Sequence, residues 1–278
     1  MTIKSIDNWL DKKNQTQDTI SELLCNRLSA TFCKPTLKKY DELPPLWHWA
    51  FFQEPAHQNA LGPDGHPNSN TFIPGINGFV RMWAGGRVKF LEPLKVGLEA
   101  VRESTITRVT EKEGSTGKLI FVTVHHEIIQ QGTLCISEEQ DIVYRPPAPV
   151  TKKSEPFAEE FDWIETVEPT PTLLFRYSAV TFNAHRIHYD WPYTTGEESY
   201  ADLVVHGPLI ATLMVKAFTD ANPKLKPVLL SYRGLKPLTA EEEFRVSGKH
   251  DEDGAAVLWA FNKHGPAHTA KLQYKETY

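Results

Sequence analysis

Apolar residues recur at helical spacing between residues 5 and 32, where Asp and Ser stand in positions that could cap helices. This pattern predicts two short helices near the start of the chain. From residue 47 to residue 77 the periodicity is lost, and Pro, Gly, Asn and His crowd into FFQEP, LGPDGHP and FIPG. Such a composition is typical of an ordered loop. The aromatic residues within it would pin the loop to the rest of the fold.

The middle of the chain changes to alternating, β-branched segments that predict strands. These are Val88 to Leu91, Leu98 to Val109, Lys118 to Ile129 and Thr133 to Tyr144. Turn sequences such as EKEGSTG and QQG separate them, so we expect an antiparallel meander. WAGGRV, at residues 83 to 88, holds a glycine pair without a nucleotide-binding pattern, which favours a tight turn before the first of these strands.

A linker is predicted at RPPAPVTKKSEP, residues 145 to 156, because it lacks periodicity and its prolines cannot join the interior of a sheet. Residues 1–150 would then form one unit and residues 157–278 a second. In the second unit, residues 206 to 220 read as a buried helix. Leu229 to Tyr274 returns to strands, with turns at HDEDG and HGP.

The two units share a short echo. RVKFLEPLKVGLEAVREST in the first and SYRGLKPLTAEEEFRVSGK in the second both read LxPL followed by a long charged strand. Two tandem copies of one small α+β unit would explain the echo, because each copy could pair its sheet edge with its twin.

Composition narrows the class of partner. The chain has 278 residues, 40% hydrophobic and 23% charged, as in ordinary globular proteins, with a net charge of -5. An acidic chain without a local basic patch is not suited to nucleic acid. No apolar run is long enough to span a membrane, and the first residues are polar where a secretion signal would be apolar. We therefore expect a cytoplasmic protein without a nucleic-acid or membrane partner.

The densest polar segment lies between Arg176 and Leu209 and holds Asn183, His185 and His188. Histidine is the side chain best suited to exchange protons near neutral pH, so these residues are candidates for acid–base catalysis. The sequence His206-Gly207-Pro208 stands where the buried helix should begin. The N–H of Gly207, at the positive end of that helix, could bind a substrate oxygen that gains negative charge.

Other interpretations of these histidines stay open. Any of them could be an ordinary surface or core residue, and His185 and His188, three residues apart, could face a metal. No carboxylate and third ligand accompany the pair at suitable spacing, and no HExxH or CxxC motif is present, so no metal and no other cofactor is expected. His125 and His126 should point to opposite faces of a strand and are expected to be structural. His57 and His66 could lie near a site or on the surface.

AVTFNAHRIHYD followed by LVVHGPL resembles the signature of the MaoC-like, hydroxyacyl-thioester dehydratase branch of the hotdog-fold proteins. PPLWHWAFF, LGPDGHP, MWAGGRVKFLEPL and SEEQDIVYR extend the likeness over nearly the whole chain. The resemblance is strongest to the itaconyl-CoA and mesaconyl-C(4)-CoA hydratases within this branch. It implies an α+β double hotdog, two tandem units that each wrap an antiparallel sheet around a long helix, the first degenerate and the second catalytic.

The resemblance also implies a reaction, the reversible addition of water across the double bond of an unsaturated dicarboxylic acyl-CoA. Related (R)-specific enoyl-CoA hydratases carry D-x-N-P-x-H, in which an Asp and a His share one water. Here His188 matches the His, but Asn183 stands five residues before it. An amide cannot accept a proton as a carboxylate does, so His188 would be the base, Asn183 would orient the water and His185 would assist.

Substrate contacts follow from the same resemblance. Gly207 and His206 would bind the acyl group near its thioester carbonyl. The free carboxylate would need a cation, and we expect it from Arg176, Arg186 or Arg233, although each could bind coenzyme A phosphates instead or remain a solvated surface residue.

Rival functions are a 3-hydroxyacyl-thioester dehydratase of fatty acyl chains, a thioesterase, and a non-catalytic acyl-CoA-binding module. Turnover and chain-length preference would separate them. Hotdog units usually associate, so a homodimer is expected by analogy.

Overall fold

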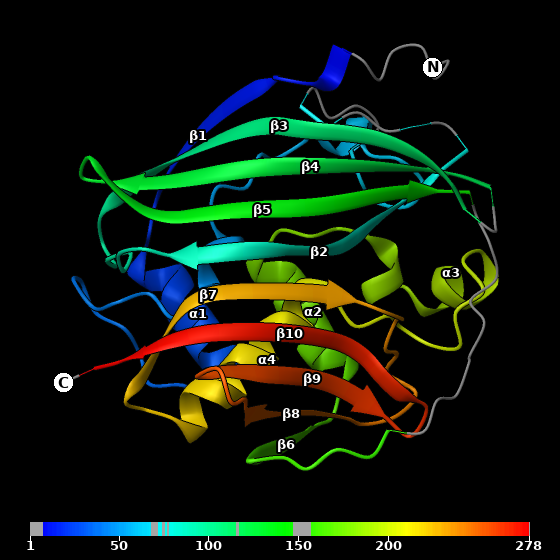
Figure 1. The fold of residues 1–278 in the computed structure, drawn as a ribbon. Helices are drawn as coiled ribbons and strands as arrows, with labels where there is room; N and C mark the ends of the chain where they lie inside the picture. Colours follow the sequence, from blue (N-terminus) through cyan, green and yellow to red (C-terminus); the bar gives the residue numbers. More distant parts are fainter. Residues whose placement is uncertain are drawn as a thin grey trace.

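The computed structural model describes residues 8–67, 72–73, 76, 78–114, 117–146 and 157–277. Ten strands form one sheet in the order β1-β3-β4-β5-β2-β7-β10-β9-β8-β6, and every neighbouring pair is antiparallel (Figure 1). The strands are β1 (Lys13–Thr19), β2 (Val80–Phe90), β3 (Glu99–Gly114), β4 (Gly117–Gln130), β5 (Thr133–Arg145), β6 (Trp163–Val167), β7 (Leu225–Gly234), β8 (Phe244–His250), β9 (Ala255–Asn262) and β10 (Gly265–Glu276).

The helices lie on one face of this sheet (Figure 1). They are α1 (Glu22–Thr31), α2 (Pro171–Val180), α3 (Trp191–Gly196) and α4 (Gly207–Ala221), with 3₁₀ turns η2 (Trp47–Ala50), η3 (Gln58–Ala60) and η4 (Arg186–His188). The expected buried helix is α4, whose residues are almost all buried from Leu209 to Phe218. It packs against β6, β7, β8 and β9. This helix and the strands around it confirm the interpretation of the second unit.

The LxPL sequence that the two units share forms equivalent strand connections in the structure. The amides of Leu91 and Glu92, which follow β2, both donate to the carbonyl of Cys135. The amides of Leu235 and Lys236, which follow β7, both donate to the carbonyl of Ala267 in the same way. In each LxPL the second leucine is 2% exposed. Since β2 pairs with β7, the two units join edge to edge at the centre of the sheet.

Among its described residues the first unit has no helix as long as α4, because α1 has 10 residues and α4 has 15, so the long helix expected in each unit is found only in the second. Between α1 and β2 the described residues form only η2 and η3. Aromatic side chains of residues 47–52 fill the core instead, with Trp47 at 5% and Phe51 and Phe52 each at 1% exposure. The architecture is a double hotdog whose first half is degenerate.

Two local predictions were also wrong. Residues 13–19 form the edge strand β1, paired with β3, where a helix was expected; alternate burial and sheet pairing outweigh the helical spacing of the flanking apolar residues. WAGGRV lies inside β2 and not in a turn. A Cβ on Gly86 would lie 2.5 Å from the hydroxyl oxygen of Tyr232, so this glycine permits the close junction with β7.

Residues 147–156 of the expected linker lie outside the described residues, and the division at 150 and 157 stays a prediction. None of the helices in the described ranges is long and apolar enough to cross a membrane.

Candidate active site

A cavity of about 1000 Å³ runs between the two units. Its wall includes residues of β2, the segment that follows α2, the first residues of α4, and a loop of the first unit. The candidate residues Asn183, His185, His188, His206 and Gly207 all line it. The structure therefore brings together the whole histidine-rich constellation that the sequence singled out.

The segment after α2 is held in a tight turn. The amide of Asn183 donates to the carbonyl of Ser178 at 2.8 Å, and Oδ1 of Asn183 accepts from the amide of His185 at 3.0 Å. η4 follows at once, and Asp190 caps α3 by accepting from the amide of Tyr193. Because the Asn183 oxygen fixes this turn, the NH₂ group is the part of its side chain that can act on a substrate or water.

His188 has the geometry of a neutral base. Its ring is 7% exposed, and Nδ1 donates to the carbonyl oxygen of Val204 at 2.7 Å. This bond places the proton on Nδ1 and leaves a lone pair on Nε2. Burial lowers the pKa of His188 to about 4, so the imidazole is uncharged at neutral pH.

His206 lies directly against His188, with ring centroids 3.6 Å apart and nearly parallel planes. Its Nε2 hydrogen-bonds Oγ of Ser178 at 2.8 Å, and Nδ1 is buried without a partner among the described residues. Burial holds the pKa of His206 well below its ordinary value. Since Gly207 follows His206, the His188 ring and the first amide of α4 lie beside the same part of the cavity.

Gly207 begins α4, where the N–H groups of the first turn have no helical acceptor. The expectation that this glycine leaves room for a substrate needs a correction, because Trp83 occupies that room. A Cβ at residue 207 would lie 2.6 Å from Cε3 of Trp83. The indole stacks on Tyr232, with centroids 4.6 Å apart. Gly207 thus lets an aromatic wall close against the helix start.

A hairpin of the first unit, residues 61–67, packs against the segment that follows α2. Leu61 and Pro67 form its bridge. The amide of Arg186 donates to the carbonyl of Asp64 at 2.9 Å, and Nη1 of Arg186 donates to the carbonyl of Pro63 at 2.7 Å. Gly65 has φ +88° and packs so closely that a Cβ would collide with the carbonyl oxygen of Ala184.

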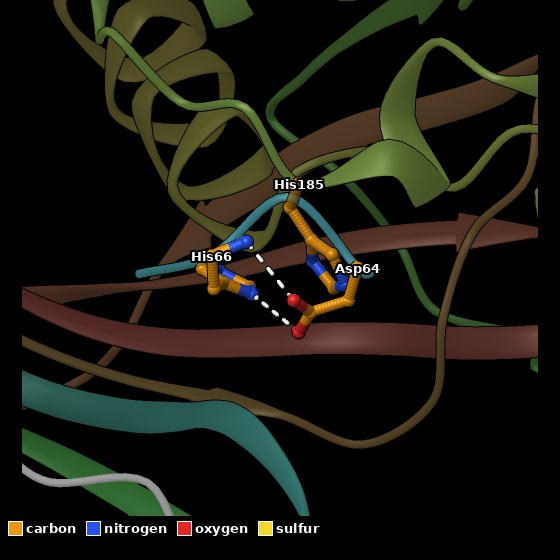
Figure 2. A group of neighbouring side chains, drawn as sticks. All are labelled: Asp64, His66 and His185. Carbon is orange, nitrogen blue, oxygen red and sulfur yellow. Dashed lines mark hydrogen bonds and ion pairs between the residues drawn. The ribbon is translucent and has the colours of Figure 1, made fainter. Parts of the chain in front are cut away.

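This hairpin places Asp64 and His66 beside His185 (Figure 2). The Nδ1 of His66 donates to Oδ2 of Asp64 at 3.0 Å, and the rings of His66 and His185 have centroids 4.2 Å apart. Ligand-type atoms of the three residues lie within 4.8 Å of one another, so the group could hold a metal ion. Spacing along the chain could not reveal the carboxylate and the third ligand, since more than a hundred residues separate them from His185.

Substitution of Gly65 by alanine tests the docking of the hairpin. We expect Gly65→Ala to lower the free energy of unfolding by roughly 3 kcal/mol, because it adds a backbone collision to the strain of a left-handed alanine. Gly132→Ala is the matched control, since Gly132 has φ +76° and no atom within 4 Å of the added Cβ. Urea denaturation measures both variants. Equal losses in the two would contradict the close contact with Ala184.

The three arginines expected to contact substrate do not line the cavity. Arg176 on α2 and Arg233 on β7 are exposed. Arg186 is engaged with Asp190 at 2.7 and 2.8 Å, and its guanidinium lies 4.0 Å from the Tyr193 ring centroid. Among the described residues, the cations of the cavity wall are Arg81, Arg102 and Lys236. The assignment of Arg176, Arg186 and Arg233 stays a prediction.

The first unit contributes a buried polar cluster that sequence reasoning missed. Glu138 accepts hydrogen bonds from Nε2 of His48 at 3.0 Å and Nε1 of Trp49 at 2.9 Å. Burial alone would raise the pKa of Glu138, but the His48 hydrogen bond and the charges around it lower it. His126 lies nearby and hydrogen-bonds Ser104, whereas His125 contacts Ser137, so the two histidines face opposite ways as expected.

Comparisons with known proteins agree with this architecture. A model of the family hydroxyacyl-thioester dehydratase type 2 matches residues 46–240. The chain is 42% identical over 253 residues to the mesaconyl-C(4)-CoA hydratase of Chloroflexus aurantiacus, covering 88% of this chain and 89% of that protein. It is 28% identical to the mitochondrial hydroxyacyl-thioester dehydratase type 2 of Schizosaccharomyces pombe, over 83% of this chain and 88% of the relative.

Among solved structures, a MaoC-like dehydratase from Phytophthora capsici aligns over 99% of this chain and 98% of its own, with a TM-score of 0.71 and 11% identity. At that identity the likeness establishes the fold alone. The family match is independent of it and spans well over half of the chain. The protein belongs to the hydroxyacyl-thioester dehydratase type 2 family and has a double hotdog fold.

Proposed function

We propose that this chain reversibly adds water to the double bond of an unsaturated dicarboxylic acyl-CoA, such as mesaconyl-C(4)-CoA or itaconyl-CoA. One observation carries the proposal: the neutral base His188 and the first amide of α4 flank the same part of one cavity. The 42% identity to a mesaconyl-C(4)-CoA hydratase supports this chemistry.

The reaction needs one group that removes a proton from water and another that stabilises negative charge on the thioester. In our proposal for mesaconyl-C(4)-CoA, whose double bond is conjugated with the thioester, the N–H of Gly207 binds the thioester oxygen, where the charge collects as an enolate. Water gives its proton to Nε2 of His188 while its oxygen bonds to the β-carbon. The NH₂ group of Asn183 orients this water. The α-carbon then takes up a proton, which completes the hydration without a redox cofactor.

A dicarboxylic substrate also needs a cation close to the reacting carbons. In mesaconyl-C(4)-CoA the free carboxylate is attached to the carbon that water attacks. Arg81 and Trp83 lie two residues apart on β2, both line the cavity, and Trp83 contacts Gly207. Burial is the main cause of the lowered pKa of His185, and the charge of Arg81 lowers this pKa further. We therefore assign the carboxylate to Arg81, whose planar guanidinium can bind it through two hydrogen bonds.

Arg81→Met tests this assignment, because methionine keeps an unbranched side chain and removes the charge. We expect kcat/KM for mesaconyl-C(4)-CoA to fall on the order of 100-fold, since a desolvated carboxylate would lose its partner. Activity toward crotonyl-CoA, which has no free carboxylate, should change less than about threefold by the same reasoning. Arg245→Met, at an exposed residue of β8 that does not line the cavity, is the matched control and should affect neither substrate. An equal loss for both substrates in Arg81→Met would contradict the assignment.

A panel of thioesters tests the function itself. Mesaconyl-C(4)-CoA, itaconyl-CoA, crotonyl-CoA and a long-chain 2-enoyl-CoA are each mixed with the protein. The absorbance of conjugated thioesters is followed, and itaconyl-CoA is followed by chromatography of the acyl-CoA product. Hydration of a dicarboxylic thioester supports the proposal. Preference for the long chain supports the fatty acyl dehydratase, which the names of the family and of the S. pombe relative favour.

Two further outcomes of the panel reject an acyl-CoA hydratase. Binding of every thioester without turnover would indicate a non-catalytic module. Release of free coenzyme A thiol would indicate a thioesterase. A cytoplasmic location and a homodimer stay predictions.

A further inference from the structure

We propose that His66, held by Asp64, is the group that delivers the proton to the α-carbon, so that the degenerate first unit supplies a catalytic residue. The inference rests on the proposed hydration and adds a named proton donor to it. His66 belongs to the hairpin of residues 61–67, which packs against the segment that follows α2.

Hydration transfers two protons, one from the oxygen of the attacking water and one to the α-carbon, and the second unit offers one clear base. His188 takes the proton of the attacking water through Nε2. Asn183 is an amide and can neither accept nor release a proton near neutral pH. His185 and His206 have no carboxylate partner among the ion pairs of the described residues. A donor for the α-carbon must therefore come from elsewhere on the cavity wall.

His66 has what such a donor requires. It lines the cavity with His185 and His188. Its Nδ1 is bound to Oδ2 of Asp64 at 3.0 Å, and its amide donates to Oδ1 of the same carboxylate, also at 3.0 Å. These two bonds fix the ring and leave Nε2 as the exchanging nitrogen. Although burial opposes it, the contacts with His66 hold the pKa of Asp64 at about 2, so an ionised carboxylate faces Nδ1 and orients the ring.

The cycle balances in protons. Protonated His66 gives its Nε2 proton to the α-carbon as the enolate collapses, and His188 has by then taken one from water. The excess proton must return from His188 to His66 before the next turnover. His185 lies between them, with its ring centroid 5.4 Å from that of His188 and 4.2 Å from that of His66. A relay through His185 and water restores the starting state without any other reactant.

Two substitutions test the assignment. We expect His66→Gln to lower kcat for hydration of mesaconyl-C(4)-CoA on the order of 100-fold, the scale of lost acid catalysis, with little change in the Kd of the hydrated product. Solvent deuterium should then enter the α-carbon at a correspondingly lower rate. Asp64→Asn keeps the ring but removes the carboxylate that orients it. We expect kcat to fall on the order of 10-fold while the Kd of the hydrated product stays unchanged, a split that loss of a purely structural contact would not produce.

Glu242→Gln is the matched control. Glu242 pairs with His264 at 3.4 Å outside the cavity wall, so this variant also removes a carboxylate from a histidine, but it should keep the wild-type rate and pH profile. Circular dichroism and urea denaturation show whether each variant is folded. If a variant does not fold, deuterium exchange at the α-carbon is repeated with His66→Asn.

Several results would overturn the inference. Wild-type rates and pH profiles in both folded variants would show that Asp64 and His66 take no part in proton transfer. Loss of wild-type turnover on addition of EDTA, with recovery on zinc, would make the three residues a metal centre instead. These outcomes differ from failure of the proposed function, in which the wild-type protein itself hydrates no unsaturated acyl-CoA.

Discussion

Replacing His188 with alanine is expected to lower kcat/KM for hydration by at least ~100-fold, the usual scale of general-base removal. The imidazole carries its proton on Nδ1, bound to the Val204 carbonyl, so Nε2 is the ring nitrogen that can accept the proton of water. Burial keeps the base neutral, with a pKa lowered to about 4. The loss should appear in kcat, because the ring acts on water and not on the coenzyme A portion of the substrate.

Two further variants serve as controls for His188→Ala. His188→Gln retains an amide that can donate to Val204 but offers no base, so it should be folded and as inactive as the alanine variant. His125→Ala removes a histidine that contacts Ser137 outside the cavity wall and should leave turnover unchanged. Near-normal turnover in His188→Ala, measured by the absorbance of the conjugated thioester, would reject His188 as the base.

The free energy of unfolding is expected to decrease strongly in mild acid. Burial lowers the pKa of His126, His188 and His268 to about 4, and it also holds the pKa of His206 well below its ordinary value. At pH above 6.5 these rings are neutral in both the folded and the unfolded chain, and they do not affect stability. As the pH falls below 6.5, the unfolded chain binds protons that the folded protein cannot accept, so the free energy of unfolding decreases.

The expected size follows from the width of this pH window. At pH 5 each of the three rings with a pKa near 4 lowers the free energy of unfolding by up to about 2 kcal/mol. Together they lower it by up to roughly 6 kcal/mol, which is comparable with the whole stability of an ordinary domain. We expect the urea midpoint to fall steeply between pH 6.5 and 5, and His126→Gln to reduce this slope. A midpoint that stays constant over the same range would contradict the burial of neutral histidines.

Local patterns predicted the parts of the fold that depend on local physics. Strands β3, β4 and β5 follow from alternation and turn residues, and α4 from its apolar run after Gly207 and Pro208. The LxPL echo identified two equivalent strand connections, because the same hydrogen-bonding task selects the same residues. The histidines of the site were found for a similar reason, since His185, His188 and His206 lie close together in the sequence and remain together in the fold.

The remaining features depend on long-range packing, which no local pattern encodes. The strand β1 forms because β3 offers an edge, and Gly207 meets Trp83 only after the two units have joined. The sequence does not show whether His66 lies near the site or on the surface, and it gives no signal for Asp64. Only the docking of their hairpin on Ala184 and Arg186 brings these two residues to the site. The arginine candidates were chosen for their nearness to the site in the sequence or for their charge. The cavity is instead lined by Arg81, which lies on β2 in the first unit.

In the proposed reaction, one cavity activates water for attack on an unsaturated thioester. Incubation with mesaconyl-C(4)-CoA in ¹⁸O-labelled water, followed by mass spectrometry of the thioesters, shows where the oxygen of that water goes. We expect a hydrated acyl-CoA that carries one heavy oxygen on its acyl chain, with no free coenzyme A. Unchanged substrate, or free coenzyme A together with an acid labelled at its carboxyl group, would contradict it.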